Sequence, residues 1–461
     1  MVFSSTVFMF LFFPLVFAAY YNPWFQGRVF RNVVLLGASL IFYAWGEPVF
    51  VFLMIFSIVV GWAVGLGIEK CRRKKLLLTL GISFHVALLF VFKYLSFLSE
   101  QFAWLFPQGY QPVHISLPIG ISFFSFQLMS YLFDVYYQKA KAQKNVLYVG
   151  LYISLFPQLI AGPIVRYEQV AEEILNRQER KDDVVTGMER FIFGLGKKVL
   201  LSNYVAQIAD NIFLMPSQSV LTAWLGAAAY TLQIYYDFSG YSDMAIGLGR
   251  MFGFHFSENF QYPYMSGSVT EFWRRWHISL GTWFRDYVYI PLGGNRVSRP
   301  RWIFNTLIVW TLTGIWHGAN WTYLLWGLFY FVLLIVERTT GFVKRTNLLS
   351  HIYTMAAVST ALVMFRSENV LQGFMQIGRM FGVRATGLID PAFFHYIWNG
   401  RTVLFFSVLL CAPVYPWLKE RLSCHQKVQE ITEAALVLLV FVLSAVNVVS
   451  STYNPFIYFN F

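Results

Sequence analysis

The sequence predicts an all-α polytopic membrane protein. Hydrophobic types make up 57% of its 461 residues and charged types only 13%, which is about half the charged share of a typical soluble domain. Apolar stretches close to the roughly 20 residues of a membrane-spanning helix recur along the whole chain. The charged residues are too few to cover the water-exposed surface of soluble domains. We therefore predict one integral membrane domain over residues 1–461.

The apolar stretches differ in length. They cover residues 3–20, 31–46, 49–67, 76–97, 116–135, 146–165, 188–210, 220–236, 240–254, 302–316, 321–336, 350–365, 402–418 and 432–450. Several are too short for a full crossing, so we expect about 11 transmembrane helices with re-entrant and interfacial helices between them. The first stretch has no basic residue before Arg28. It is therefore predicted to remain as the first membrane helix rather than to be cleaved as a signal peptide.

The net charge of +12 arises from Lys and Arg between the apolar stretches. The basic run at residues 70–75 predicts a cytoplasmic loop, because cytoplasmic loops carry an excess of Lys and Arg. Such loops meet anionic lipid headgroups. This distribution accounts for the positive charge without a nucleic-acid partner.

The cysteines give no sign of a disulfide framework. Cys71, Cys411 and Cys424 are odd in number and show no paired spacing. Cys71 lies in the basic run and Cys424 in a charged segment, so both are predicted to face the reducing side. Neither the cysteines nor the histidines show metal-ligand spacing, and we expect no metal site.

His317 is the strongest candidate for a catalytic residue. It lies in a stretch from Trp302 to Val336 without Asp, Glu, Lys or Arg. As one helix this stretch would measure about 52 Å, more than the roughly 30 Å hydrocarbon core. We therefore expect a break at Gly314, Gly318 or Asn320. An ionisable residue at such a break indicates a functional site, and a neutral imidazole suits a general base; the alternative is a structural histidine bonded to a neighbouring helix.

A second candidate cluster lies in residues 255–301, a long stretch that is neither apolar nor loop-like. Trp273, Trp276 and Trp283 are spaced to share one helical face, and arginines occupy the other face. This pattern predicts an amphipathic helix that lies in the membrane interface.

The predicted helix also carries a polar strip of residues that suggests a binding site for a phosphate-bearing donor. His277 lies one turn beyond Trp273. Arg274 and Arg275 are placed to bind the phosphates of a donor such as coenzyme A, since the planar guanidinium matches phosphate geometry. The alternative is that these arginines only reach towards lipid headgroups.

Two further motifs interrupt apolar stretches. Asp237 and Asp243 flank Gly240, where a helix break is permitted. Buried carboxylates need partners, which Arg250 or the arginines of residues 255–301 can supply, and a structural salt bridge is the alternative to a catalytic acid. In addition, two prolines and a glycine at residues 156–167 predict a kink or a re-entrant turn.

Several strings together resemble the membrane-bound O-acyltransferase family. They are Phe272–Ser279, Trp316–Gly318, Met1–Ser5, Leu159–Pro163, Asp237–Gly249, Arg285–Tyr287 and Leu292–Arg296. The similarity covers nearly the whole chain. It is closer to the bacterial members that O-acetylate alginate-type polysaccharides than to those that attach D-alanine to teichoic acid.

The resemblance implies a ring of helices around a thinned central channel, with the core of the domain at about residues 116–340. His317 matches the catalytic histidine of the family and His277 its second functional histidine. Besides the two histidines, we expect three residues to support the site and three others to bind the donor. The supporting residues are Asp237, Asn320 and Trp316, and the donor-binding residues are Trp273, Arg274 and Arg275.

The implied reaction is acyl transfer across the inner membrane of a bacterium. The donor is acetyl-CoA or another acyl thioester from the cytoplasm, with no bound cofactor. The acetyl group passes to a hydroxyl of an exported polysaccharide such as alginate or cellulose. An extracytoplasmic acetyltransferase with Ser-based chemistry is the expected partner protein.

Two other functions fit parts of the pattern. One is transfer of D-alanine or another acyl group to a teichoic acid-like polymer. The other is a polysaccharide or acyl transporter without chemistry, because transporters also place polar residues at broken helices near the midplane. A transporter predicts that replacement of His317 alters flux rather than polymer modification.

Overall fold

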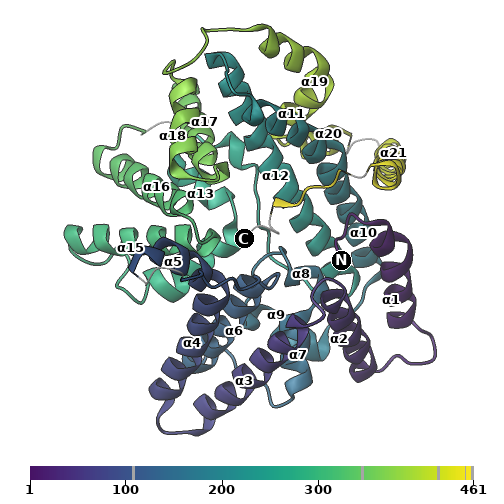
Figure 1. Ribbon diagram of the computed structural model, residues 1–461. Helices are drawn as coiled ribbons and strands as arrows, with labels where there is room; N and C mark the ends of the chain where they lie inside the picture. The colour runs from purple at the N-terminus through teal and green to yellow at the C-terminus, as the bar shows by residue number, and fades with distance from the viewer. Residues whose placement is uncertain (106–109, 344–346, 423–425, 452, 458–461) are drawn as a thin grey trace. The chain divides into compact units, whose positions relative to one another are not determined.

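The computed structural model describes residues 1–105, 110–343, 347–422, 426–451 and 453–457 (Figure 1). Within these ranges every regular element is a helix, as the sequence predicts. The chain forms two compact units. Unit 1 comprises Met1–Phe191 and Met244–Ser257, and unit 2 comprises Ile192–Asp243 and Glu258–Phe461.

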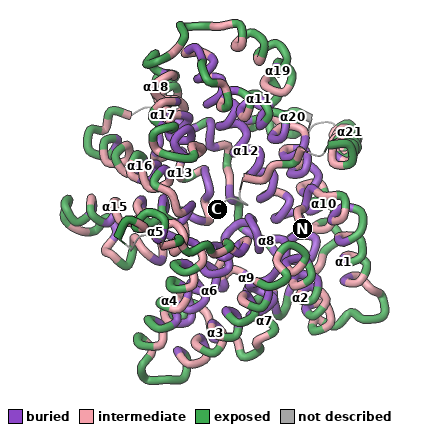
Figure 2. Tube along the Cα trace, in the orientation of Figure 1, coloured by how far each residue is buried: buried purple, intermediate pink, exposed green. Residues whose placement is uncertain are grey.

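Unit 1 is built around the buried helix α6. Its helices are α1 (Phe13–Tyr20), α2 (Arg28–Ala44), α3 (Phe50–Lys70), α4 (Lys74–Leu89), α5 (Leu95–Gln101), α6 (Ile121–Tyr136), α7 (Val146–Ser154), α8 (Phe156–Leu159), α9 (Tyr167–Asn176) and the first part of α10 (Lys181–Gly196). Helices α3 and α4 both pack on α6, which Figure 2 shows buried along most of its length. Gly65 permits this approach, because a Cβ there would lie 2.6 Å from the Tyr131 ring.

A charged cluster ties the start of unit 1 to the segment after α9. Glu179 accepts hydrogen bonds from Tyr20, Arg28 and Arg31. The guanidinium of Arg177 donates to Asn32 at 2.7 Å. These contacts join α1 and α2 to residues 177–179, far along the chain.

Unit 2 contains most of the longest helix, α12 (Val220–Met251), whose last residues from Met244 belong to unit 1. Its other helices are α11 (Asn203–Leu214), α13 (Val269–Arg275), α14 (Ile278–Phe284), α15 (Arg299–His317), α16 (Trp321–Thr340), α17 (Leu348–Arg366), α18 (Val370–Met380), α19 (Pro391–Leu409), α20 (Val414–Leu422) and α21 (Gln426–Ser450). Figure 2 shows α12 largely buried and α21 largely exposed. An exposed apolar α21 is suited to contact with lipid.

The expected break at Gly240 is absent, because α12 is one helix of 32 residues. The two predicted stretches 220–236 and 240–254 are therefore parts of a single helix. Gly240 serves close packing instead: a Cβ there would lie 2.7 Å from the carbonyl oxygen of Gly194. Glycine is needed because a neighbouring backbone occupies the space, and the helix continues through it.

Five helical segments in the described part of the chain are long and apolar enough to cross a membrane. They are Phe50–Lys70, Lys74–Gln101, Trp321–Thr340, Leu348–Arg366 and Gln426–Ser450. Pro391–Leu409 and Val414–Arg421, bent by 65°, make a sixth if they form one span. These lengths indicate a polytopic membrane protein, but they do not confirm the predicted 11 crossings. The first predicted span is the shorter apolar segment Phe8–Tyr20, and the stretch 146–165 holds only the nine-residue α7 before the chain turns at α8.

The predicted amphipathic helix at residues 255–301 is wrong as a single helix. The chain forms two short helices, α13 and α14, which are separated at Trp276 and His277. The break arises because His277 adopts left-handed backbone angles (φ 44°, ψ 52°), which end a right-handed helix. Trp276 and Trp283 are nevertheless buried, so the predicted apolar face exists although its helix does not continue.

Candidate functional site

His317 is the last residue of α15, so the chain breaks after it as predicted, but Gly314, one of the positions proposed for the break, lies inside the helix. Gly318 follows with extended backbone. The side chain of Asn320 then caps α16 by accepting a hydrogen bond from the Thr322 N–H at 3.1 Å. The same side chain donates to the Glu368 carbonyl at 2.7 Å. Asn320 thus fixes the turn that follows His317.

Helices α15 and α16 form a hairpin with almost no space between their backbones. A Cβ at Gly314 would lie 2.5 Å from the Tyr323 carbonyl oxygen, and one at Gly327 would lie 2.4 Å from the Trp310 carbonyl oxygen. Real Cβ atoms do not approach backbone atoms so closely. The two glycines therefore hold the hairpin closed beneath His317.

The imidazole of His317 is packed among aromatic rings and only 4% exposed. Its ring centroid lies 4.9 Å from that of Trp326, 5.0 Å from Trp316 and 5.2 Å from Phe365. The Trp326 and Phe365 rings meet it edge to face. Such packing restricts the imidazole to one orientation.

His277 lies between α13 and α14, outside the candidate membrane spans, and is 1% exposed. Its Nδ1 lies 3.2 Å from the side-chain oxygen of Asn259, and the Phe238 ring meets the imidazole edge to face at 4.7 Å. Burial lowers the pKa of His277 to about 3. The ring is therefore neutral at physiological pH and able to accept a proton.

Trp316 connects the two histidines. Its ring centroid lies 6.0 Å from that of His277 and 5.0 Å from that of His317. Both imidazoles thus border one indole, although they come from separate segments. The structure brings together His277, Trp316 and His317, three of the residues that the sequence singled out.

Asp237 is paired with Lys198, not with an arginine. Its carboxylate lies 2.5 Å from the Lys198 ammonium, with both side chains nearly inaccessible. Asp243 pairs with Lys197 at 2.6 Å. Both lysines belong to the π-helical turn Lys197–Ser202, so the expected arginine partners are wrong, while the salt-bridge interpretation of the motif is confirmed.

The segment at residues 453–457 reaches the same ion pair. The backbone N–H of Ile457 donates to Asp237 at 2.9 Å, and the Lys198 ammonium donates to the Pro455 carbonyl. The ring of Phe456 stacks on Tyr241 at 4.8 Å. Sequence reasoning missed this neighbourhood, because only the fold brings the last helix and its following segment to α12.

The three predicted donor-binding residues face different surroundings. Trp273 packs edge to face on Trp310 at 4.7 Å and on Tyr330 at 4.9 Å. Arg275 forms an ion pair with Glu271 at 2.8 Å. Arg274 is exposed and lines two cavities of about 390 and 650 Å³. Trp273 also lines the smaller of these cavities, so two of the three residues, Trp273 and Arg274, are placed to meet a ligand there.

A larger cavity of about 970 Å³ is lined by Phe365, whose ring packs on His317 at 5.2 Å, whereas His317 itself does not line it. Phe365 and Tyr323 line it, and their rings are 5.0 Å apart. Arg366 also lines it and is held by Asp210 at 2.6 Å. The lining combines aromatic faces with charged and amide groups, a mixture suited to a hydroxyl-rich or peptide ligand. No motif in the sequence indicated this cavity, because its walls come from segments far apart in the chain.

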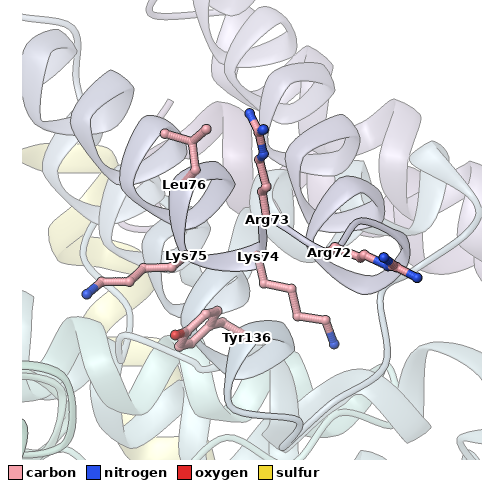
Figure 3. Close-up of a pocket in the computed structure, with 6 residues that line it drawn as sticks. All are labelled: Arg72, Arg73, Lys74, Lys75, Leu76 and Tyr136. Carbon is pink, nitrogen blue, oxygen red and sulfur yellow. The ribbon is translucent and has the colours of Figure 1, made fainter.

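A basic cavity of about 610 Å³ lies in unit 1. Figure 3 shows Arg72, Arg73, Lys74 and Lys75 around it, with Tyr136 from the end of α6. The four basic side chains belong to the run at residues 70–75 that the sequence predicts to be a cytoplasmic loop; Arg72 and Arg73 lie between α3 and α4, and Lys74 and Lys75 begin α4. None of the predicted site residues lines this cavity.

Among the described residues, no three His, Cys, Asp or Glu side chains come together as a metal-binding group. The two described cysteines are not bonded to one another, since Cys71 is exposed and Cys411 is buried. Cys424 lies outside the described residues.

The chain matches the family model described as membrane-bound O-acyltransferase over residues 71–369. It is 38% identical to a probable alginate O-acetylase of Pseudomonas putida, across 100% of both chains. It is 42% identical to a probable alginate O-acetylase of Pseudomonas aeruginosa, over 83% of this chain and 75% of that protein. A peptidoglycan O-acetyltransferase of Helicobacter pylori is 33% identical, over 84% of this chain and 81% of that protein.

Proposed function

Since this chain belongs to the membrane-bound O-acyltransferase family, we propose that it O-acetylates an exported polysaccharide of the alginate or cellulose type. The observation that carries the proposal is the position of His317. It is a buried imidazole at the turn of a helical hairpin. It packs on Phe365, which lines a cavity, and it borders the same Trp316 indole as a second buried histidine, His277. The names of the relatives, two of them O-acetylases of alginate, supply the acyl group and the polymer class.

In the proposed reaction His317 is the general base. It takes the proton of an acceptor hydroxyl, whose oxygen attacks the carbonyl carbon of the acetyl thioester. The C–S bond breaks, the thiolate leaves and takes up the proton from the imidazolium, and an ester is formed. His277, on the other side of the Trp316 indole, orients the reacting groups.

The donor proposed is acetyl-CoA from the cytoplasm, or another acyl thioester. Arg274 offers a guanidinium at the wall of two cavities, where it can bind phosphate. No metal or bound cofactor takes part in the proposed chemistry, since a thioester needs only a base and a positioned acceptor.

We propose that the acceptor uses the cavity of about 970 Å³ that is lined by Phe365, the aromatic neighbour of His317. The acceptor is a hydroxyl of the polysaccharide or the serine of an extracytoplasmic acetyltransferase that passes the group on. The peptidoglycan O-acetyltransferase relative shows that polymer acceptors vary among similar proteins. The proposed location is the inner membrane of a bacterium, with anionic lipids around the basic loops.

The test is the ester content of secreted polymer in cells with the wild-type protein, no protein, or His317→Gln. His85→Gln is the matched control, because His85 is also buried but lies in α4 of unit 1. We expect ester to be lost in the deletion and in His317→Gln, to persist in His85→Gln, and polymer export to continue throughout. Membrane levels of each variant are measured by immunoblot.

The chemical identity of the released acid separates the alternatives. Acetate after mild alkaline hydrolysis supports the proposal, whereas D-alanine or another acid assigns a different acyl group. Normal ester content in His317→Gln would remove this residue from the chemistry. Reduced polymer export with unchanged esterification would favour a transporter.

A further inference from the structure

Asn259 makes four contacts with the segment that carries His277. Its backbone carbonyl accepts a hydrogen bond from the Ile278 N–H at 3.0 Å. Its side-chain oxygen lies 3.2 Å from Nδ1 of His277, 3.2 Å from the backbone nitrogen of Ser279 and 2.9 Å from Oγ of Ser279. Asn259 is itself buried. One asparagine thus holds the beginning of α14.

The Ser279 backbone N–H decides which way the Asn259 amide points. A backbone N–H can only donate, so the amide atom that faces it must be the oxygen. The amide nitrogen then lies on the other side, where it donates to Oγ of Ser242 in α12 at 3.1 Å. The orientation of an asparagine amide is otherwise a matter of assignment, but here the backbone donor fixes it.

The same oxygen fixes the position of the proton on His277. An amide oxygen cannot donate, so the contact of 3.2 Å requires that Nδ1 carries the hydrogen. In the neutral imidazole, Nε2 then holds a lone pair. Nε2 is buried and has no hydrogen-bond partner among the residues that the structure describes. Its lone pair is left for a group that enters the site.

We propose that Asn259, held by Ser242, is the positioning residue that fixes His277 in its Nδ1–H tautomer, so that Nε2 faces the reacting groups as a hydrogen-bond acceptor. The inference rests on the proposed role of His277 in acyl transfer. It also gives a function to the Asp237–Asp243 motif: Phe238 packs on the imidazole, and Ser242 holds the asparagine.

Burial keeps the His277 ring neutral. The surrounding residues therefore decide only which of its two nitrogens carries the proton. Burial lowers the pKa of His277 to about 3. Within the described residues, its hydrogen-bond and ring contacts are with four uncharged residues, Asn259, Ser279, Phe238 and Trp316. The left-handed backbone at His277 is a costly conformation for a residue other than glycine. Three hydrogen bonds from the following two residues to Asn259 hold it in place.

The first test reads the tautomer directly. Solid-state NMR of the full-length protein in lipid, labelled with ¹⁵N-histidine, distinguishes protonated from bare ring nitrogens, and His277→Gln identifies the His277 signals. We expect a protonated Nδ1 and a bare Nε2 in the wild type. Asn259→Leu, which has similar volume but no acceptor, should shift the ring towards the Nε2–H form. Ser279→Ala is the matched control and should keep the wild-type tautomer, because the backbone N–H of residue 279 remains.

The second test measures transfer of labelled acetyl from acetyl-CoA to polymer by membranes of producing cells. Because acid–base groups contribute large factors, Asn259→Leu should lower the maximal rate by roughly tenfold to a hundredfold with an unchanged KM for acetyl-CoA. Asn259→Asp retains an acceptor, so its rate should approach that of the wild type at high pH. Its carboxylate raises the pKa of His277, so the rate should fall at acidic pH, where the wild type shows no such fall.

The outcomes separate this inference from the proposed function. Suppose that Asn259→Leu keeps the wild-type tautomer and rate while His277→Gln loses activity. This result would contradict the positioning role of Asn259 and would still support the proposed function. If the tautomer shifts as expected but His277→Gln transfers acetyl normally, the proposed role of His277 falls instead. An Asn259→Asp profile that matches the wild type at every pH would also overturn the positioning role.

Discussion

The ammonium of Lys198 and the carboxylate of Asp237 face each other in a place that water scarcely reaches. Desolvation of two such charges is costly, and their attraction offsets it only while both are present. The pair also anchors residues 455–457 through the Pro455 carbonyl and the Ile457 N–H. At the scale of single residues, this pair is therefore the charged contact whose loss should matter most.

Removal of one member of the Lys198–Asp237 pair should destabilise the protein more than removal of both. Lys198→Met leaves a buried carboxylate unpaired, and we expect a loss of about 3–5 kcal/mol in unfolding free energy. Lys198→Met combined with Asp237→Leu should recover a large part of that loss, because no buried charge remains. Thermal melts of the purified variants in detergent, arranged as a double-mutant cycle, measure the coupling. Simple addition of the two single losses would contradict this account.

The sequence singled out individual residues where a residue type carries its own signal. His277 and His317 stand out as ionisable groups in aromatic or apolar strings, and the structure places both beside Trp316. Asn259 and Lys198 could not be predicted. Nothing distinguishes this asparagine or this lysine from others until the fold brings them to His277 and Asp237.

At the scale of elements, the α15–α16 hairpin is the part of the site with the least tolerance for change. Its two helices touch backbone to backbone at Gly314 and Gly327. The break that makes the hairpin was predictable, because an uncharged stretch too long for one crossing must turn. The break at His277 was not, because the spacing of the tryptophans is the same whether or not one residue between them is left-handed.

Gly327→Ala should weaken the hairpin and the chemistry together. The added methyl meets the Trp310 carbonyl oxygen, so the helices must separate, and overpacking of this kind costs about 1–3 kcal/mol. We expect a lower melting temperature and less polymer ester, since His317 moves with α15. Gly37→Ala in α2 is the matched control. No atom lies within 4 Å of its added methyl, and alanine favours a helix interior, so stability should stay equal or rise. Equal effects of the two substitutions would argue against the packing account.

At the scale of the whole molecule, helix content and a membrane environment were predictable from composition, whereas the number of crossings was not. Several apolar stretches fall on helices shorter than a span, such as the nine residues of α7. Composition cannot distinguish such segments from full crossings. The two compact units were also absent from the prediction, because no change in composition marks their boundaries.

The stability of the protein should decline in acid through Glu179. Burial by itself raises the pKa of this carboxyl, but hydrogen bonds from Arg28 and Tyr20 outweigh burial and lower the pKa below its ordinary value of 4.5. A carboxyl with a lowered pKa in the folded state stabilises above its unfolded value, and this contribution is lost as the pH falls through the folded value. The melting temperature of the wild type should therefore fall as the pH drops below 4.5.

Glu179→Gln isolates this contribution. The variant should melt at a lower temperature than the wild type at neutral pH, because Arg28 and Arg31 lose their anionic partner. The difference between the two proteins should shrink in acid, where the wild-type carboxyl is also neutral. Melting curves followed by tryptophan fluorescence in detergent measure both values. A constant difference at every pH would mean that Glu179 acts through packing alone.

Directed evolution of the proposed acceptor range should leave the α15–α16 hairpin unchanged and vary residues of another helix that line the cavity of about 970 Å³. The seam at Gly314 and Gly327 transmits any substitution there to His317. Gln372 and Met375 line the same cavity from the separate helix α18, and their exchange does not touch the seam. A combinatorial library at these two positions would test whether the cavity selects the proposed acceptor while the imidazole of His317 keeps its place.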